Sequence, residues 1–243
     1  MPKKRLDLLV QEKYPQLTRT HIQSLIMQGK VRVYDQVITK AGQATHEDAE
    51  IAVDLAVPKF VSRAGFKLEK ALDHFGIDVT DFLVLDAGLS TGGFTDCLLQ
   101  RGAKKIFGVD VGHAQVHEKI RRDPRVVVME QTNLRYLESL PEKVDLVTLD
   151  LSFISVLKVM DAVTKQLKPQ GKLIVLIKPQ FEAEKHQVGK GGIIKDPAVH
   201  QEVIDKITNG IESFGYTCQG VIESPIEGGD GNKEFLAYFN RNF

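Results

Sequence analysis

From about residue 59 to the end of the chain, short apolar runs alternate with amphipathic stretches, and this pattern constrains the fold most strongly. The runs consist largely of Val, Ile and Leu, and the stretches between them repeat apolar residues at helical spacing. Strands that are apolar throughout and joined by helices are typical of a mainly parallel sheet covered on both faces. We therefore predict an α/β fold with a doubly wound, mainly parallel sheet over residues 59–243. In chain order, the predicted strands are FLVLDAG, KIFGVDVG, VVVMEQT, VDLVTLDL, KLIVLIKP and the closing FLAYF.

Residues 1–58 show a different pattern, which predicts a small α+β domain. RLDLLVQEKY has helical periodicity, and a second helix, RTHIQSLIMQ, follows Thr18, a residue type that caps helices. VRVYDQVITK alternates like a hairpin that turns at Asp35 and Gln36, and IAVDL supplies another strand. Ala56-Val57-Pro58 is interpreted as a linker, because Pro58 breaks strand pairing.

The formal net charge of the chain is zero, but its first 45 residues are basic. They hold eight Lys and Arg against three Asp and Glu, a net charge of +5. Such an excess is typical of a surface that binds phosphates, and it is equally consistent with a solvated basic face. Charge alone leaves both interpretations open.

Composition narrows the possible classes of function. Two cysteines, Cys97 and Cys218, are too few for a disulfide framework, and no signal sequence opens the chain, so we expect a cytoplasmic protein. The apolar runs are far shorter than the roughly 18 residues of a membrane span, which gives no support for a helical pore. The seven histidines are scattered, and we expect no metal site. Ser152 and Ser155 lack the G-x-S-x-G context of a hydrolase nucleophile.

Four polar residues stand beside separate apolar runs. They are Lys67 in SRAGFKLEKAL, Asp150 in LVTLDLSF, Lys178 in LIVLIKPQF and Glu234 in GNKEFLAYF. If the sheet brings them together, each carboxylate can hold one lysine while the two lysines oppose each other. Two ammonium groups in one cleft disfavour the doubly charged state, which would let one lysine act as a general base. Each residue alone is more often part of a surface ion pair, and only the set of four predicts a catalytic site.

A glycine-rich turn follows the first predicted strand of the sheet. The segment LVLDAGLSTGGFTDCLL lacks the G-x-G-x-x-G spacing of dinucleotide-binding proteins, but its glycines let a ligand approach the backbone closely. Asp110 ends the second strand, where an acidic residue can receive a ribose diol, and Asn133 follows the third strand, where it could bind an adenine edge. Gly92 is expected to lie against the end of the same ligand that is farthest from the adenine. The candidate cofactor-binding residues are Asp86, Gly88, Ser90, Gly92, Gly93, Asp110, Asn133 and Asp150.

The N-terminal pattern resembles the RNA-binding domain named after ribosomal small-subunit protein four. RLDLLV and TRTHIQSLIMQGKVRVYDQVITKAG carry this resemblance over most of residues 1–58. It implies that a positive face of the two helices binds structured RNA. The residues to which it gives that role are Arg5, Arg19, Lys30 and Arg32. A folded appendage without an RNA role is the alternative.

The rest of the chain resembles the FtsJ-type ribose 2′-O-methyltransferases, which use S-adenosyl-L-methionine. The order of glycine turn, Asp110 and Asn133 is similar to that class, and so is the set of four polar residues described above. The fusion to an RNA-binding domain is similar to the TlyA family, whose members are described both as hemolysins and as ribosomal RNA methyltransferases. DLSFIS, KPQFE, VGKGGIIKDPAVH and GNKEF support this likeness, whereas GHAQVHEKI departs from it at His113, where an aromatic residue is expected.

The resemblance implies an enzyme that methylates the ribose 2′-hydroxyl of ribosomal RNA at cytidine. Lys178 would be the base, Lys67 the neighbouring cation, and Asp150 and Glu234 the residues that orient the two lysines. Two alternatives stay open, a non-catalytic RNA-binding factor in ribosome assembly and a membrane-active hemolysin.

Two further features allow more than one interpretation. Phe153 and Phe181 are expected to pack in the core rather than to stack on bases. VGKGGIIKD is either a lid over the substrate or an ordinary loop.

Overall fold

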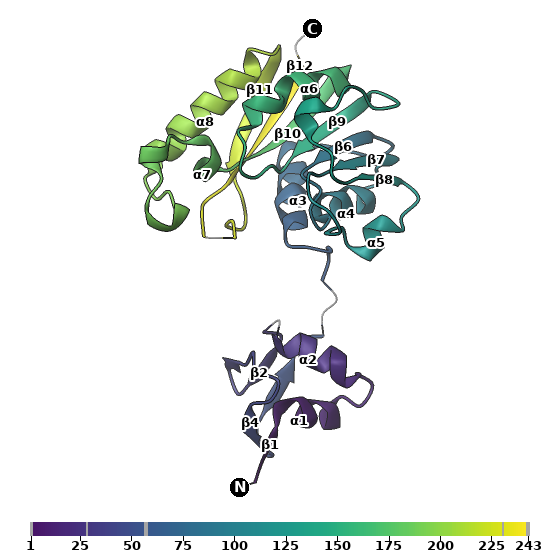
Figure 1. The fold of residues 1–243 in the computed structure, drawn as a ribbon, viewed down its shortest axis with the longest axis vertical. Helices are drawn as coiled ribbons and strands as arrows, with labels where there is room; N and C mark the ends of the chain where they lie inside the picture. The colour runs from purple at the N-terminus through teal and green to yellow at the C-terminus, as the bar shows by residue number, and fades with distance from the viewer. Residues whose placement is uncertain (1, 28, 56–57, 230, 242–243) are drawn as a thin grey trace. The chain divides into compact units, whose positions relative to one another are not determined.

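The computed structural model describes residues 2–27, 29–55, 58–229 and 231–241. The chain divides into two compact units, Met1–Pro58 and Lys59–Phe243, and each has its own hydrophobic core (Figure 1). Residues 56 and 57 of the predicted linker lie outside the described residues. Within the described ranges, no helix combines the length and the apolar character needed to cross a membrane.

The N-terminal unit combines two helices with two small antiparallel sheets. One sheet pairs the first strand with the fourth, and the other places the second strand between the third and the fifth. Leu6, Val10, Ile22 and Ile26 are buried between the helices and the strand that begins at Val31. The elements are β1 (Lys3–Arg5), α1 (Leu6–Lys13), α2 (Arg19–Met27), β2 (Val31–Val33), β3 (Gln36–Val37), β4 (Ala44–His46) and β5 (Ile51–Val53).

The start of α2 agrees with the sequence prediction, whereas the hairpin differs from it by one residue. Thr18 caps α2, because its Oγ1 accepts a hydrogen bond from His21 N at 3.3 Å. The β2–β3 hairpin is present, but it turns one residue earlier than expected, at Tyr34 and Asp35, since Val33 pairs with Gln36. Tyr34 takes a left-handed φ of 52°, which such two-residue turns require.

A buried carboxylate organises the basic surface of the N-terminal unit. Asp7 is fully buried, and its two oxygens accept hydrogen bonds from the guanidinium of Arg5 at 3.0 and 2.9 Å. Arg19 and Gln23 also donate to Asp7 Oδ2, at 3.2 and 2.9 Å. These contacts, the hydrogen bonds from Arg5 above all, hold the pKa of Asp7 well below its usual range. Arg5 and Arg19, which are expected to bind RNA, therefore also pair with Asp7 inside their own unit.

The C-terminal unit is built on a seven-stranded sheet in the order β11-β12-β10-β9-β6-β7-β8. Strands β10, β9, β6, β7 and β8 are parallel, whereas β12 is antiparallel to both of its neighbours. The strands are β6 (Leu83–Ala87), β7 (Lys105–Val109), β8 (Val126–Met129), β9 (Val144–Leu149), β10 (Leu167–Ile177), β11 (Tyr216–Glu223) and β12 (Phe235–Arg241).

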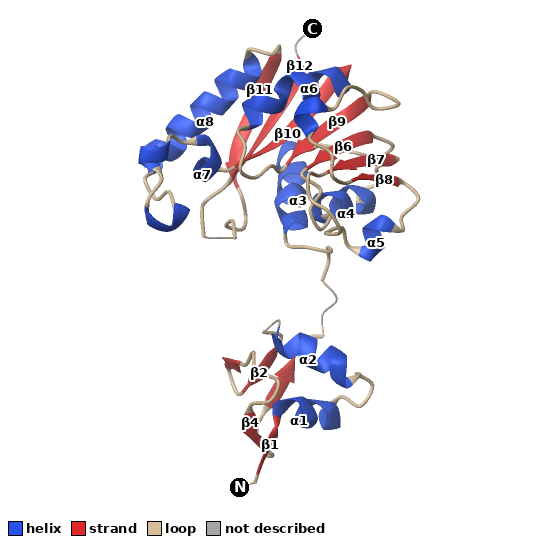
Figure 2. Ribbon diagram, in the orientation of Figure 1, coloured by secondary structure: helices blue, strands red, loops and turns tan. Residues whose placement is uncertain are grey.

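Helices cover both faces of this sheet (Figure 2). Val84 and Leu85, which are neighbours in β6, pack into different cores, one with α3, α4 and α5 and the other with α6 and α8. Both faces are therefore buried, which explains why the strands are apolar throughout and confirms the predicted doubly wound sheet. The helices and helical turns are α3 (Ala64–Phe75), α4 (Gly93–Gln100), α5 (Glu118–Arg121), η1 (Leu134–Tyr136), η2 (Val156–Val159), α6 (Met160–Gln166), α7 (Pro179–Glu182), η3 (Lys185–Gln187), η4 (Lys190–Gly192) and α8 (Pro197–Glu212).

Strand β11 is absent from the sequence prediction. Gln219 and Gly220 interrupt its apolar pattern, and the register with β12 shifts between Cys218 and Gly220. Such a bulge removes the simple alternation by which a strand is recognised in a sequence.

Candidate active site

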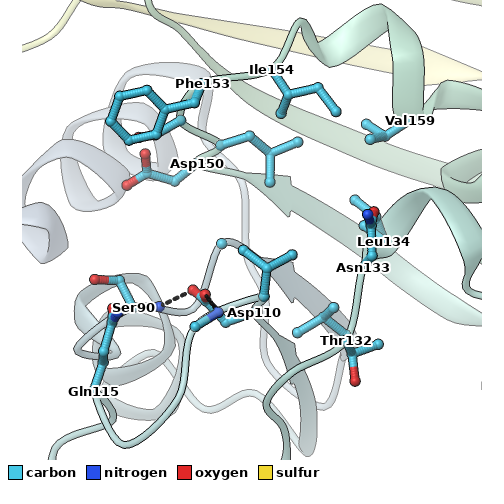
Figure 3. Close-up of a pocket in the computed structure, with 16 residues that line it drawn as sticks. Ser90, Asp110, Gln115, Thr132, Asn133, Leu134, Asp150, Phe153, Ile154 and Val159 are labelled. Carbon is cyan, nitrogen blue, oxygen red and sulfur yellow. Dashed lines mark hydrogen bonds between the residues drawn. The ribbon is translucent and has the colours of Figure 1, made fainter.

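A cavity of about 450 Å³ opens beside the loops that follow β6, β7, β8 and β9 (Figure 3). This is the carboxyl edge of the parallel strands, where α/β sheets bind their ligands. The volume lies within the range of small-molecule pockets, roughly 300–1,000 Å³. The predicted cofactor-binding residues that line the cavity are Gly88, Ser90, Asp110, Asn133 and Asp150.

Asp110 ties together the loops after β6 and β7. Its Oδ2 accepts a hydrogen bond from Ser90 N at 2.7 Å, and its Oδ1 accepts one from Gly112 N at 2.7 Å (Figure 3). Two backbone amides thus fix the carboxylate at the cavity wall. Because each oxygen has two lone pairs, both can still accept hydrogen bonds from a ligand.

Gly88 allows β6 and β9 to converge at the cavity. It has a φ of +88°, and a Cβ at this position would lie 2.2 Å from the carbonyl oxygen of Asp150. Asp150 N in turn donates to Ala87 O at 2.9 Å. Any side chain at residue 88 would therefore push Asp150 away from the end of β6.

Asp86 lies under the cavity rather than in its wall. The carboxylate is fully buried and accepts hydrogen bonds from Thr95 Oγ1 at 2.6 Å and Thr148 Oγ1 at 2.8 Å. Burial raises the pKa of Asp86 to about 6, although both threonines favour the ionised form. Since Thr95 belongs to α4 and Thr148 to β9, Asp86 locks the glycine turn onto the central strands.

Gly92 and Gly93 do not line the cavity, in contrast to the sequence expectation. A Cβ on Gly92 would lie 2.8 Å from Ile120 Cγ1, and one on Gly93 would lie 2.2 Å from Ser62 Oγ. These two glycines therefore allow the start of α4 to pack closely against α5 and against the segment before α3. Gly93 also borders a small crevice of about 70 Å³ that it shares with Gly88 and Asp150.

Lys178 is held between two residues of the loop that follows β9. Its Nζ lies 2.6 Å from Asp150 Oδ1 and donates a hydrogen bond to Ser152 Oγ at 2.9 Å. Both charged side chains are largely buried, with exposed fractions of 11% for Lys178 and 16% for Asp150. Sequence reasoning paired Asp150 with a lysine but did not identify Ser152 as a further partner.

Lys67 and Glu234 form a second, more deeply buried ion pair. Lys67 lies on α3, whereas Glu234 directly precedes β12. Ile177 pairs with Phe235 across β10 and β12, so the next residues along, Lys178 and Glu234, are cross-strand neighbours. Because β12 is antiparallel, its amino end lies at the carboxyl edge of the parallel strands. The sheet thus brings the four predicted catalytic residues together as two lysine–carboxylate pairs.

Phe153 is the most exposed large hydrophobic residue among those described, with an exposed fraction of 90%. It lines the cavity, has a left-handed φ of 64°, and places its ring 4.9 Å from that of Phe181. The expectation that Phe153 packs in the core is therefore wrong. The apolar letters of DLSFIS could not reveal this, because the exposure follows from an unusual backbone angle.

The glycine-rich loop VGKGGIIKD is anchored to the segment before β12. Asn232, which is almost fully buried, accepts a hydrogen bond from Ile194 N and donates one to Gly192 O, both at 3.0 Å. His200 Nε2 lies 3.1 Å from Ile194 O. Asn232, which sequence reasoning missed although it belongs to GNKEF, thus connects this loop to the strand start that carries Glu234.

His113 and His117 stand four residues apart, a spacing at which helical histidines can share a metal ion. The segment between them is not helical, however, and His117 instead caps α5 by accepting a hydrogen bond from Lys119 N. The Nδ1 of His113 lies 3.7 Å from Glu130 Oε2. Within the part of the chain that the structure describes, no group of three or more His, Cys, Asp and Glu could hold a metal ion.

The predicted RNA-binding residues of the N-terminal unit differ in their surroundings. Arg5 and Arg19 keep half of their side-chain surface exposed while they pair with Asp7. Lys30 lies in the turn before β2, and Arg32 projects from the exposed side of that strand. All four can therefore reach solvent.

We expect Asp86→Asn to change the pH dependence of stability. The pKa of Asp86 is about 6 in the folded protein against an ordinary value of 3.8, so the folded state holds the proton more tightly. The stability that this proton contributes is present below pH 3.8 and disappears as the pH rises through about 6. The loss should amount to roughly 3 kcal/mol and should be absent in Asp86→Asn.

Urea unfolding between pH 4 and 7, followed by circular dichroism, measures this difference. Thr148→Val serves as a companion variant, because it removes a hydrogen bond that favours the ionised form and should move the transition to higher pH. If the wild type and Asp86→Asn differ by a constant amount across the range, Asp86 does not titrate there.

Both units of the chain resemble known protein families. The FtsJ-like methyltransferase model matches residues 60–241, and the S4 domain model matches residues 4–51. A candidate rRNA methyltransferase of Bacillus subtilis, YqxC, is 43% identical over 98% of this chain and 86% of its own length. The 16S/23S rRNA (cytidine-2′-O)-methyltransferase TlyA of Mycobacterium tuberculosis is 39% identical over 91% of this chain and 84% of its own.

A solved structure of a candidate hemolysin from Streptococcus thermophilus aligns with a TM-score of 0.77 and 38% identity. The alignment covers all of this chain and 90% of that one. The match therefore includes both units of the chain and not the sheet alone. The chain belongs to the TlyA family: an S4 domain followed by an FtsJ-like methyltransferase domain.

Proposed function

We propose that this protein is an S-adenosyl-L-methionine-dependent methyltransferase that modifies the ribose 2′-hydroxyl of ribosomal RNA at cytidine. Membership of the FtsJ-like family supports the chemistry. The substrate is supported by the M. tuberculosis relative, which is named for cytidine 2′-O-methylation of 16S and 23S rRNA. The S4 domain supports docking on a ribosomal subunit or its RNA, and the cytoplasm is then the place of action.

The observation that carries the proposal is the meeting of two lysine–carboxylate pairs at one edge of the sheet. Lys178 pairs with Asp150, Lys67 pairs with Glu234, and the β10–β12 register makes Lys178 and Glu234 neighbours. Asp150 also lines the cavity. The two pairs therefore stand beside the space that a cofactor would occupy.

The groups that line the cavity suit S-adenosyl-L-methionine. Asp110 is held so that both of its oxygens can accept hydrogen bonds from ribose hydroxyls, and Asn133 can donate to an adenine edge through Nδ2. Gly88 exposes its backbone between these groups and Asp150. When bound, this cofactor supplies an electrophilic methyl group on a sulfonium sulfur.

The protein itself must align a ribose hydroxyl and take up its proton. We assign the proton to Lys178 Nζ, because Asp150 and Ser152 fix that nitrogen beside the cavity. A lysine accepts a proton only as a neutral amine. After the transfer, the Asp150 carboxylate stabilises the ammonium form of Lys178.

Phe153 offers a surface on which the substrate base can stack. Its exposed ring belongs to the same loop as Asp150 and borders the cavity. Stacking of a base on an aromatic side chain contributes about 1–3 kcal/mol and requires a base that is not paired. A nucleotide held there would bring its ribose toward Lys178.

The buried ion pair favours an enzyme over a non-catalytic assembly factor. Lys67 and Glu234 are both almost fully buried, and burial of two charges is often no more stabilising than an apolar pair of similar volume. A protein that only binds RNA has no evident use for such a pair next to a cofactor-sized cavity. Its place beside Lys178 fits a role in catalysis.

We predict that Lys178→Ala lowers the rate of single-turnover methylation by on the order of a hundredfold or more. Lys178→Arg should be equally slow, because a guanidinium keeps the positive charge but cannot accept a proton. The affinity for S-adenosyl-L-methionine, measured by calorimetry, should be nearly unchanged.

Lys168→Ala is the matched control for this experiment. Lys168 pairs with Asp145 at 2.7 Å and joins the same two strands at their other end. Its replacement should therefore leave the rate unchanged. Normal turnover of Lys178→Arg would rule out a proton transfer to this side chain.

We predict that Lys30→Ala combined with Arg32→Ala weakens the binding of ribosomal RNA and reduces its salt dependence. For every phosphate that the variant no longer binds, the slope of log affinity against log salt concentration should fall by about one unit. The affinity for the cofactor should not change. The double variant Lys105→Ala with Lys168→Ala removes the same charge from the methyltransferase unit and serves as the control. Equal RNA affinity of the two double variants would argue against docking through the S4 unit.

A further inference from the structure

Helix α7 and the loop after β9, residues 150–156, are joined at three successive places. Lys178, which directly precedes α7, contacts Asp150 and Ser152 at the start of the loop. Phe181 packs against Phe153 in the middle of the loop, with 4.9 Å between ring centroids. At the end, Glu182 Oε1 accepts a hydrogen bond from Val156 N at 2.8 Å. The loop therefore has a contact with the helix near each end and one at its centre.

The methyl transfer proposed above assigns no role to the carboxyl group of Glu182. It is only 3% exposed, and burial raises its pKa, although hydrogen bonds from Ser155 and Val156 and the charges of Lys206 and Lys158 act in the opposite direction. Its backbone oxygen accepts a hydrogen bond from Lys206 Nζ of α8 at 2.6 Å. Glu182 is thus fixed to α8 through its main chain and to the loop through its side chain.

The conformation of the loop explains why such an anchor is needed. Phe153 has a φ of 64°, which is unfavourable for a bulky side chain, and the residue is 90% exposed. A residue in such a conformation keeps it only when its surroundings hold it there. Asp150 N is bonded to Ala87 O at one end of the loop, and Val156 N is bonded to Glu182 at the other.

We propose that Glu182 is a positioning residue that holds the 150–156 loop against α7 and thereby places Asp150 beside Lys178 and keeps the ring of Phe153 exposed. The effect of Glu182 on methyl transfer rests on the proposed function, whereas its effect on the position of the 150–156 loop does not. Glu182 would contact neither substrate nor cofactor.

Three variants test the catalytic part. Glu182→Ala removes the acceptor and should lower the single-turnover rate on purified ribosomal RNA, measured at saturating S-adenosyl-L-methionine, by on the order of tenfold. Glu182→Gln keeps an oxygen acceptor and mimics the neutral acid, so its rate should stay within about twofold of the wild type. Val156→Pro removes the donor at the first residue of η2, a position that tolerates proline, and should be as slow as Glu182→Ala.

Combination and control variants separate positioning from general loss of stability. Glu182→Ala together with Val156→Pro should be no slower than Glu182→Ala alone, because that single substitution already removes the hydrogen bond between Val156 and Glu182. Gln166→Ala removes another buried acceptor, which binds Leu140 N at 2.9 Å, and should reduce stability without changing the rate. Additive losses, or a Glu182→Gln enzyme as slow as Glu182→Ala, would overturn the proposal.

A fluorescent reporter tests the mechanical part without any turnover. The chain contains no tryptophan, so Phe153→Trp introduces a single indole at the centre of the loop. In that background Glu182→Ala should lower the anisotropy of the indole, and Glu182→Gln should not. Unchanged anisotropy in a folded Glu182→Ala protein would refute the anchoring role. A wild type that transfers no methyl group would instead refute the proposed function, and the anisotropy would still decide the role of Glu182.

Discussion

The site depends on the register of β10 between a parallel neighbour, β9, and an antiparallel one, β12. Val175 pairs with Leu149 on one side, and Ile177 pairs with Phe235 on the other. Asp150 directly follows Leu149, Lys178 directly follows Ile177 and Glu234 directly precedes Phe235, so this register places Lys178 near both carboxylates. A shift of one residue on either side would turn these side chains toward the opposite face. The apolar residues that fill both cores thus also fix the distance between the polar ones.

At the centre of the carboxyl edge of the sheet, the backbone at the end of β6 must also lie close to the backbone that follows β9. Gly88 lets the end of β6 lie against the carbonyl of Asp150, and Asp86 below it joins α4 to β9 through two threonine hydroxyls. Asp110 then connects the neighbouring loop through backbone amides. These contacts rigidify the wall of the cavity on the side toward Asp150, and Glu182 provides the corresponding anchor for the 150–156 loop.

The alternation of apolar runs with amphipathic stretches was sufficient to predict the doubly wound sheet, because strands buried on both faces are apolar throughout. The sequence predicted that each of the two carboxylates could hold a lysine, but not which lysine pairs with which carboxylate. Three features could not be predicted in this way. Strand β11 is broken by a bulge at Gly220, and the exposure of Phe153 follows from a positive φ. The contact of Gly92 with Ile120 depends on how two helices pack.

Single residues in the N-terminal unit illustrate the same limit. A sequence shows that Arg5 and Arg19 are basic, but not that both donate to one buried carboxylate, Asp7. Residues far apart in the chain meet there only because α1 and α2 pack together. Charge counts therefore predict the sign of a surface better than the role of each arginine on it.

If this edge of the sheet transfers a methyl group to a ribose oxygen of ribosomal RNA, the methyl group must be found on that oxygen after the reaction. The most direct measurement is mass-spectrometric mapping of purified ribosomal RNA after incubation with the protein and S-adenosyl-L-methionine labelled in the methyl group. We expect label on the 2′-oxygen of cytidine, with the base unmodified. Label on a base atom, or RNA without label from a protein that binds the cofactor, would contradict it.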